Sequence, residues 1–228
     1  MSAIDPRSVS VVVVAAGSGL RMGASVRKPW LDLAGAPVVV HVLRRFAALD
    51  LTREIVLVVH PDDVSRAGTL RVEFPSLKVV KGGRHRADSV RAGLDAASAD
   101  VPLVAIQDAA RPLVDADVIV RVCEAARKTG AAIPTMPLAG TIKEVAPGEG
   151  WISRTVPRGG LFEAQTPQVF KAELIRRAYR ELTDLDVTDD AQAVERLGEK
   201  VAAVAGSKFN FKITTPEDLK LAEALLKR

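Results

Sequence analysis

The sequence predicts an α/β protein with a doubly wound, mostly parallel sheet, and two observations lead to this prediction. Short runs rich in β-branched residues lack polar alternation, as is typical of strands that a parallel sheet buries on both faces. Amphipathic stretches of helical period separate these runs, so strands and helices alternate along the chain. With 228 residues, of which 48% are hydrophobic, the chain can bury one large core. We therefore expect a single domain over residues 1–228.

The first part of the chain follows this alternation up to Pro137. The apolar runs that predict strands are 10–14, 54–59, 77–80, 102–106 and 131–136. The amphipathic stretches that predict helices are 37–48, 88–97 and 115–128. Together they form successive βαβ units, which build a doubly wound sheet.

After Pro137 the pattern changes. Two short runs, 141–145 and 151–155, flank a Pro-Gly-Glu-Gly turn at 147–150 and predict a β-hairpin. We expect this hairpin to form an arm, about residues 138–162, that projects from the sheet. An apolar hairpin that projects exposes surface unless a second subunit covers it, so we also expect a homodimer in which the arms are exchanged.

The C-terminal part predicts two helices, two strands and a last helix. The helices are expected at 171–182 and 188–197, and the strands at 200–204 and 209–213. The last helix is predicted to begin after Thr215, which can cap it, with Pro216 in its first turn and Asp218 completing a capping box.

Composition excludes several classes of protein. A single cysteine, Cys123, cannot form a disulfide framework, and its place in a helical pattern indicates a core residue. The apolar run 11–16 is too short to span a bilayer and residues 1–10 lack a signal-peptide layout, so we expect a cytoplasmic protein without a membrane partner. The net charge of +4 is dispersed and only 4% of residues are aromatic, which argues against a nucleic-acid partner.

The most informative segment follows the first predicted strand, where small residues lead into a basic loop. Backbone N–H groups in such a loop can approach phosphates closely. The spacing of Gly17, Gly19 and Gly23 is one residue too long for a dinucleotide fingerprint, and no glycine is followed by Lys-Ser or Lys-Thr as in a Walker loop. The loop therefore predicts phosphate binding of another kind.

This loop and several later motifs carry a resemblance to a known family. The pattern A-A-G-x-G-x-R-M-G, a lysine seven residues after the arginine, and L-x-G-x-P-V resemble the opening of sugar-phosphate nucleotidyltransferases, which have a Rossmann-like fold. Further motifs, similar to those of the 2-C-methyl-D-erythritol 4-phosphate cytidylyltransferases, are GGRHRADSV from Gly82, QDAARP from Gln107, TIK from Thr141, TVPRGGL from Thr155, AQTPQ from Ala164, VTDDA from Val187 and FKITTPEDL from Phe211.

The resemblance implies CTP and a polyol phosphate as substrates and assigns roles to the matching residues. The nucleotide would be bound by Ala15, Ala16, Gly17, Gly19, Gly83, Ser89 and Asp108. The acceptor would be bound by Asp108, Arg111, Thr141, Arg158, Thr188 and Lys212. Catalysis would depend on Arg21 and Lys28 at the triphosphate, and on Arg158 and Lys212 at the acceptor phosphate. Thr141 and Arg158 lie on the arm, which in this family reaches the site of a neighbouring subunit.

Elementary chemistry agrees with a site that lacks a nucleophilic side chain. A phosphate monoester has a second pKa of about 6, so the acceptor is already an anion that can attack phosphorus. The protein must then bring two anions together and neutralise the charge that develops, which requires Arg, Lys and Mg²⁺. We expect the triphosphate and water to hold the Mg²⁺, without a dedicated set of protein ligands.

Some positions depart from the family pattern or allow a structural interpretation. The family's usual P-K-Q is Arg27-Lys28-Pro29 here, which moves the rigid residue and adds a charge. Gln107 replaces a frequent histidine, and Gly140 and Pro157 replace acidic residues that often precede the arm threonine and arginine. Further residues have structural alternatives. Thr188, Asp189 and Asp190 look like a helix N-cap and first turn, and Lys212 could guard an edge strand against aggregation.

Three other functions remain open at this stage. A ribitol-5-phosphate cytidylyltransferase would share the fold, the first loop and the arm, and acceptor choice depends on hydroxyl contacts that motifs describe poorly. A noncatalytic nucleotide-binding domain would not need both Arg21 and Lys28. A nucleic-acid-binding module would require strongly salt-dependent duplex binding.

Overall fold

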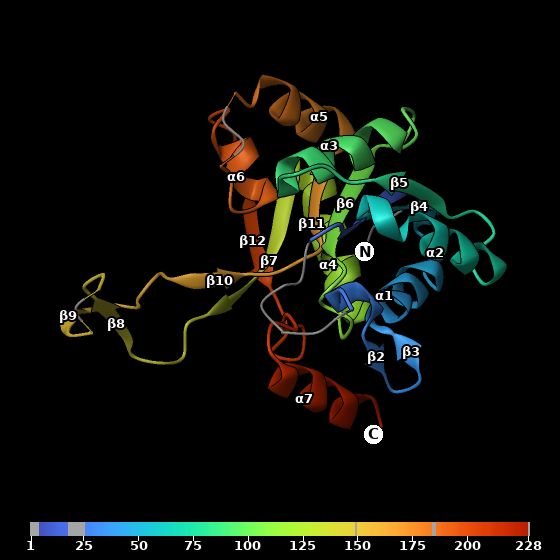
Figure 1. Ribbon diagram of the computed structural model, residues 1–228. Helices are drawn as coiled ribbons and strands as arrows, with labels where there is room; N and C mark the ends of the chain where they lie inside the picture. The colour runs from blue at the N-terminus through green and yellow to red at the C-terminus, as the bar shows by residue number, and fades with distance from the viewer. Residues whose placement is uncertain (1–4, 18–25, 149, 184–185, 228) are drawn as a thin grey trace.

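The computed structural model describes residues 5–17, 26–148, 150–183 and 186–227, and at its centre lies one mixed sheet of eight strands (Figure 1). Its strand order is β10-β7-β11-β6-β1-β4-β5, and β12 also pairs with β7. The strands are β1 (Val9–Ala15), β4 (Thr52–Val59), β5 (Lys78–Lys81), β6 (Leu103–Asp108), β7 (Ala131–Pro137), β10 (Phe162–Ala164), β11 (Gln168–Lys171) and β12 (Ala202–Ala205). Most neighbours are parallel, as predicted, while β10 and β11 run antiparallel to theirs.

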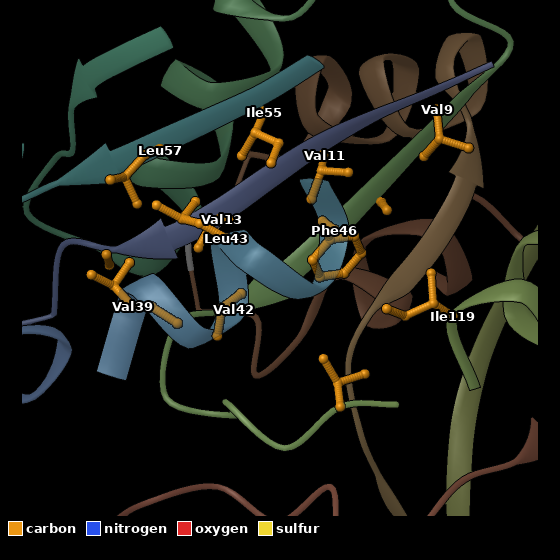
Figure 2. Packing of buried hydrophobic residues seen from close by; sticks show 14 of the residues in the cluster. Val9, Val11, Val13, Val39, Val42, Leu43, Phe46, Ile55, Leu57 and Ile119 are labelled. Carbon is orange, nitrogen blue, oxygen red and sulfur yellow. The ribbon is translucent and has the colours of Figure 1, made fainter. Parts of the chain in front are cut away.

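Helices cover both faces of this sheet, which confirms the doubly wound α/β class. The helices are α1 (Val38–Ala47), α2 (Val64–Thr69), α3 (Arg86–Ala96), α4 (Ala116–Thr129), α5 (Ala172–Glu181), α6 (Asp190–Glu195) and α7 (Pro216–Leu226). Because side chains alternate along a strand, Val11 and Val13 of β1 pack against α1 and α4, whereas Val12 packs on the face of α3 and α5. Figure 2 shows the first of these cores, with Phe46 and Leu43 of α1 beneath β1.

The α1 and α4 face also contains the single cysteine. Cys123 of α4 is fully buried in this core, and burial raises the pKa of its thiol to about 12. The prediction of a core cysteine is confirmed, since such a thiol stays protonated and unreactive.

The predicted hairpin is present and extends away from the sheet (Figure 1). Its strands β8 (Ile142–Val145) and β9 (Ile152–Val156) pair antiparallel with each other, in a sheet of their own. Trp151 is 77% exposed and Ile152 is 60% exposed, so the arm presents large apolar side chains to solvent.

The C-terminal prediction was wrong in one element. Residues 209–213 do not form a strand, although β12 and α7 form close to their expected places. Two hydrogen bonds to the turn after β6 hold this segment, and one of them comes from Arg111, which also bonds β10. The N–H of Ile213 donates to the carbonyl of Ala110, and Arg111 joins the carbonyls of Asn210 and Ala164. The segment thus crosses the end of the sheet and does not extend its edge.

Smaller elements complete the chain. A two-stranded sheet, β2 (Asp32–Leu33) and β3 (Ala36–Pro37), precedes α1, and short 3₁₀ turns occur at η2 (Lys28–Trp30), η3 (Pro61–Asp63) and η4 (Leu70–Val72). The helix predicted at 188–197 is shorter, because α6 begins at Asp190. The last helix has the predicted capping box between Thr215 and Asp218. Among the described residues, no helix is long and apolar enough to cross a membrane.

Candidate active site

Several predicted site residues meet where β1, β5 and β6 end. β1 lies between β4 and β6, so the chain winds in opposite directions from it, and loops that leave such strands form a crevice at their carboxyl ends. The loop after β1 begins with Ala16 and Gly17, that after β5 contains Gly82 and Gly83, and β6 ends in Asp108. This edge of the sheet is the candidate site.

The turn after β5 packs closely against the loop after β1. A methyl group added to Gly82 would lie 2.3 Å from Cβ of Ala16 and 2.7 Å from Oγ of Ser89. The N–H of Gly83 donates to Oγ of Ser89 at 3.2 Å, and this hydroxyl donates to the carbonyl of His85. Only glycine fits at position 82, and the result is a wall of backbone beside Ala16. Such a wall suits a small, flat ligand group.

Asp108 is the centre of the charged part of the site. Its carboxylate accepts a hydrogen bond from Nζ of Lys212 at 2.7 Å and lies 3.6 Å from the guanidinium of Arg86. Burial alone would raise the pKa of Asp108, but the positive charges of Arg86 and Lys212 outweigh it and lower the pKa. The carboxylate is therefore ionised at neutral pH and fixes the ammonium group of Lys212, whose side chain remains 43% exposed. Lys212 can thus offer its charge to an anionic ligand.

A buried network that the sequence analysis missed supports this pair. Arg86 forms two hydrogen bonds, of 2.9 and 2.7 Å, with the fully buried carboxylate of Asp190, which also accepts one from Tyr179. Burial alone would lower the pKa of Arg86, but Asp190 and Asp108 raise it, so its charge persists. Both residues lie in motifs that the sequence analysis identified, Arg86 in GGRHRADSV and Asp190 in VTDDA. The sequence shows no local pattern that indicates their pairing, because they are 104 positions apart.

Arg111 is brought close to the site but faces inward. Its side chain is 7% exposed and donates to the backbone carbonyls of Asn210 at 2.7 Å and Ala164 at 3.2 Å. These contacts tie the segment that carries Lys212 to β10. In this arrangement Arg111 holds other site residues in position, and little of its surface is left for a ligand.

The structure describes residues on either side of the basic loop that follows β1. Ala15 and Ala16 are buried at the end of β1, and Gly17 is exposed. Lys28 begins η2, in which Pro29 and Trp30 are buried. Arg27 forms ion pairs with Asp62 and Asp63 just beyond β4. The predicted residues Arg21 and Gly19 lie outside the described residues.

The arm residues are not brought to this site within one chain. Thr141 and Arg158 are exposed, and the arm that carries them extends away from the ends of β1 and β6 (Figure 1). Thr188 is also exposed, beside the start of α6, and its N–H donates to Oε1 of Gln192. Asp189 is the helix N-cap here, because its side chain accepts from the N–H of Gln192. The expectation that residues 188–190 provide a helix N-cap and first turn is confirmed, with Asp189 as the cap and Asp190 as the first helical residue.

Two further features of the structure bear on what the site can hold. A cavity of about 710 Å³ lies at the opposite edge of the sheet, where Ser8 precedes β1 and Leu103 begins β6, away from the charged cluster. In the part of the chain that the structure describes, no group of three or more His, Cys, Asp and Glu side chains could hold a metal ion. Asp108, the carboxylate of the cluster, is already paired with Lys212 and Arg86.

Comparison with known proteins gives a consistent result. The family model described as 2-C-methyl-D-erythritol 4-phosphate cytidylyltransferase matches residues 9–228. A relative of that name from Pelotomaculum thermopropionicum is 43% identical, over 96% of this chain and 94% of its own. The chloroplastic relative from rice is 41% identical, over 98% of this chain and 76% of its own. The crystal structure of 4-diphosphocytidyl-2C-methyl-D-erythritol synthase from Anaerococcus prevotii superimposes with a TM-score of 0.85 at 31% identity, covering 99% of this chain and 98% of its own.

Proposed function

Because the chain belongs to the 2-C-methyl-D-erythritol 4-phosphate cytidylyltransferase family, we propose that it transfers the cytidylyl group of CTP to 2-C-methyl-D-erythritol 4-phosphate. The products are 4-diphosphocytidyl-2-C-methyl-D-erythritol and pyrophosphate, in the non-mevalonate route to isoprenoids. The observation that carries this function is the Lys212–Asp108 pair at the end of β6, beside the backbone wall of Gly82 and Ala16. A cation held next to a wall of backbone suits a phosphate acceptor and a nucleotide with a small, flat base.

The reaction needs one nucleophilic displacement at phosphorus. An oxygen of the acceptor phosphate forms a bond to the α-phosphorus of CTP, the bond from that phosphorus to the bridging oxygen breaks, and pyrophosphate leaves with the electron pair. The acceptor is an anion at neutral pH, so no side chain has to remove a proton. Lys212 holds the acceptor phosphate, and Lys28 and Arg21 stabilise the negative charge of the triphosphate as it shifts to pyrophosphate.

We also propose that Mg²⁺ accompanies the nucleotide. Mg²⁺ keeps several waters and is commonly bound by one or two carboxylates together with substrate phosphates. Asp108, which is paired with two cations, does not suit a metal cage, whereas a metal brought by the triphosphate fits the site. When bound, the metal neutralises phosphate charge. The protein residues bind and orient the two substrates around it.

The arm belongs to a second part of the proposal. Thr141 and Arg158 complete the acceptor site of a neighbouring subunit, in a homodimer built from single domains of residues 1–228 whose arms are exchanged. The exposed apolar side chains Trp151 and Ile152 support this arrangement, because a second subunit would cover them. Thr188, exposed beside α6, would contact the acceptor from the subunit's own chain. We place the enzyme in the cytoplasm, with no nucleic acid or membrane as partner.

A pyrophosphate-release assay with purified protein tests the function directly. CTP is supplied with 2-C-methyl-D-erythritol 4-phosphate or with D-ribitol 5-phosphate. In a second series, ATP replaces CTP as the nucleoside triphosphate. We expect rapid release only with CTP and the erythritol acceptor. Faster turnover of the ribitol acceptor, or equal use of ATP, would overturn the assignment.

A further inference from the structure

The segment that carries Lys28 is tied to the neighbouring strand by an ion-pair cluster. Arg27 donates to Asp62 at 2.7 Å and to Asp63 at 3.1 Å, so one guanidinium is shared by two carboxylates. The side chain of Arg27 is 27% exposed and that of Asp63 is 11% exposed. The Arg27–Asp63 pair is partly buried and is therefore less screened by salt than a surface pair, whereas the side chain of Asp62 is 70% exposed.

The ion-pair cluster lies at the ends of two neighbouring strands, β1 and β4. β1 and β4 are adjacent, and Ala15 pairs with Val59 at their ends. The chain leaves β1 at Ala15, and at Arg27 it is bound to the residues that follow Val59. Both ends of this stretch are therefore anchored at one corner of the sheet, and Lys28 is the residue directly after the second anchor.

A second contact holds the other side of Lys28. The guanidinium of Arg66 in α2 lies 4.7 Å from the ring centre of Trp30, which is a cation–π distance. Within the turn, the N–H of Trp30 donates to the carbonyl of Arg27 at 2.9 Å, and that of Leu31 donates to the carbonyl of Lys28. The segment from β4 to α2 thus holds the residues before and after Lys28.

We propose that Arg27, through Asp62 and Asp63, is a positioning residue that fixes the backbone at Lys28 for catalysis. The inference rests on the proposed function, since it assigns Lys28 to the triphosphate. Two carboxylates hold the guanidinium of Arg27, whereas the proposed function assigns the triphosphate to Lys28.

The alternative is that Arg27 itself binds the triphosphate, and the two roles predict opposite effects of removing the carboxylates. If Arg27 is a positioning residue, Arg27→Met and the combined Asp62→Asn and Asp63→Asn change both loosen Lys28 and both lower kcat. If Arg27 binds phosphate, neutralising the carboxylates releases its charge and tightens CTP binding, while Arg27→Met raises the KM for CTP.

The experiment measures kcat and the KM for CTP in these variants and in the triple variant, with thermal unfolding midpoints. We expect kcat to fall on the order of tenfold in Arg27→Met and in the Asp62→Asn, Asp63→Asn variant. A small misplacement of a catalytic group can lower the rate by up to about 10²-fold. The KM for CTP should change less than kcat. The triple variant should be no slower than the slower of the two, because the residues act as one unit. Arg27→Lys should recover part of the rate.

Two controls separate this inference from the proposed function. Arg44 and Glu73 form a matched ion pair away from the site, and Arg44→Met with Glu73→Gln should leave kcat unchanged. If Lys28→Ala abolishes activity while the Arg27 and carboxylate variants match this control, the positioning role is wrong and the proposed function stands. If Lys28→Ala keeps full activity, the role of Lys28 in the proposed function fails, and the positioning role fails with it. Tighter CTP binding in the carboxylate variant would also overturn the inference.

Discussion

At the scale of single residues, the site is defined by which charges are paired inside the protein. The sequence predicted Asp108 and Lys212 as site residues, and the structure joins them at 2.7 Å. It also predicted Arg111 as a ligand-binding residue, and within this chain two of its guanidinium nitrogens donate to backbone carbonyls. The motif identifies the residue type and its position, but only the packed structure shows whether a charge faces a ligand or the protein.

The Asp108–Lys212 pair gives the first prediction. Lys212→Ala should raise the KM for the acceptor by roughly tenfold or more, because a hydrogen bond to a charged group contributes about 1.5–3 kcal/mol. Asp108→Asn should also raise the KM for the acceptor. The KM of the double variant should not exceed that of Lys212→Ala, because Asp108 acts through Lys212. Steady-state kinetics with each substrate varied in turn measure this. As a control, Lys227→Ala removes an exposed lysine–glutamate pair of α7. An acceptor KM in Asp108→Asn equal to that of this control would contradict the positioning of Lys212.

Glu54 carries a second residue-scale prediction, on acid stability. Its carboxylate is 9% exposed and accepts hydrogen bonds from Ser10 and Ser98. It also forms an ion pair with Lys78. Burial alone would raise the pKa of Glu54, but these partners lower it to about 2. The folded state has the lower pKa, so the stabilisation is fully present above the ordinary value near 4.5 and is lost as the pH falls toward 2.

The Glu54→Gln variant tests whether the stabilisation by Glu54 is lost as the pH falls. At pH 7 the variant should be less stable than the wild type, because the neutral amide cannot form the ion pair with Lys78. Urea unfolding at a series of pH values should show this difference shrinking between pH 4.5 and pH 2. A difference that is independent of pH would show that the hydrogen bonds of Glu54 do not depend on its charge.

At the scale of elements, the regular βαβ units could be predicted and the irregular ones could not. Runs such as 54–59 are long and apolar, and β4 forms there because a strand buried on both faces needs such residues. By contrast, β10 and β11 contain three and four residues, and β11 pairs with β6 about 60 positions earlier in the chain. The stretch 209–213 has the alternation of a strand, but it has no strand neighbour at the end of the sheet. Non-local pairing of this kind leaves little trace in a local pattern.

The turn after β5 gives an element-scale prediction. Gly82→Ala places a methyl group 2.3 Å from Cβ of Ala16, an atom attached to the backbone that cannot rotate away. The turn must shift, so we expect a loss of stability of about 1–3 kcal/mol and a rise in the KM for CTP. Thermal unfolding and nucleotide kinetics measure both. Gly68→Ala in α2 is the matched control, because open space surrounds it and the change should stabilise the helix by about 0.5–1 kcal/mol. CTP kinetics equal to those of Gly68→Ala would exclude the turn from the nucleotide site.

At the scale of the whole molecule, the arm is the feature that a single chain leaves unexplained. The turn residues at 147–150 made the hairpin predictable, because glycines at 148 and 150 adopt positive φ there. The proposal that a second subunit covers the arm concerns contacts between molecules, and one sequence carries no direct signal of such contacts. The exposed apolar side chains of the arm, which extends away from the sheet, support the proposed shared site (Figure 1).

The last prediction tests whether the site is shared between subunits. Arg158→Ala and Lys28→Ala chains should each form nearly inactive homodimers, because every site then lacks one required charge. If Arg158 acts in the partner's site, a mixed dimer has one site with both defects and one site with neither. Random exchange makes half of the dimers mixed, so activity should recover to about one quarter of the wild-type value. The pyrophosphate-release assay before and after subunit exchange measures the recovery, and differently tagged chains verify that mixed dimers have formed. If mixed dimers form without recovery, Arg158 acts within its own chain, because each subunit then keeps its own single defect.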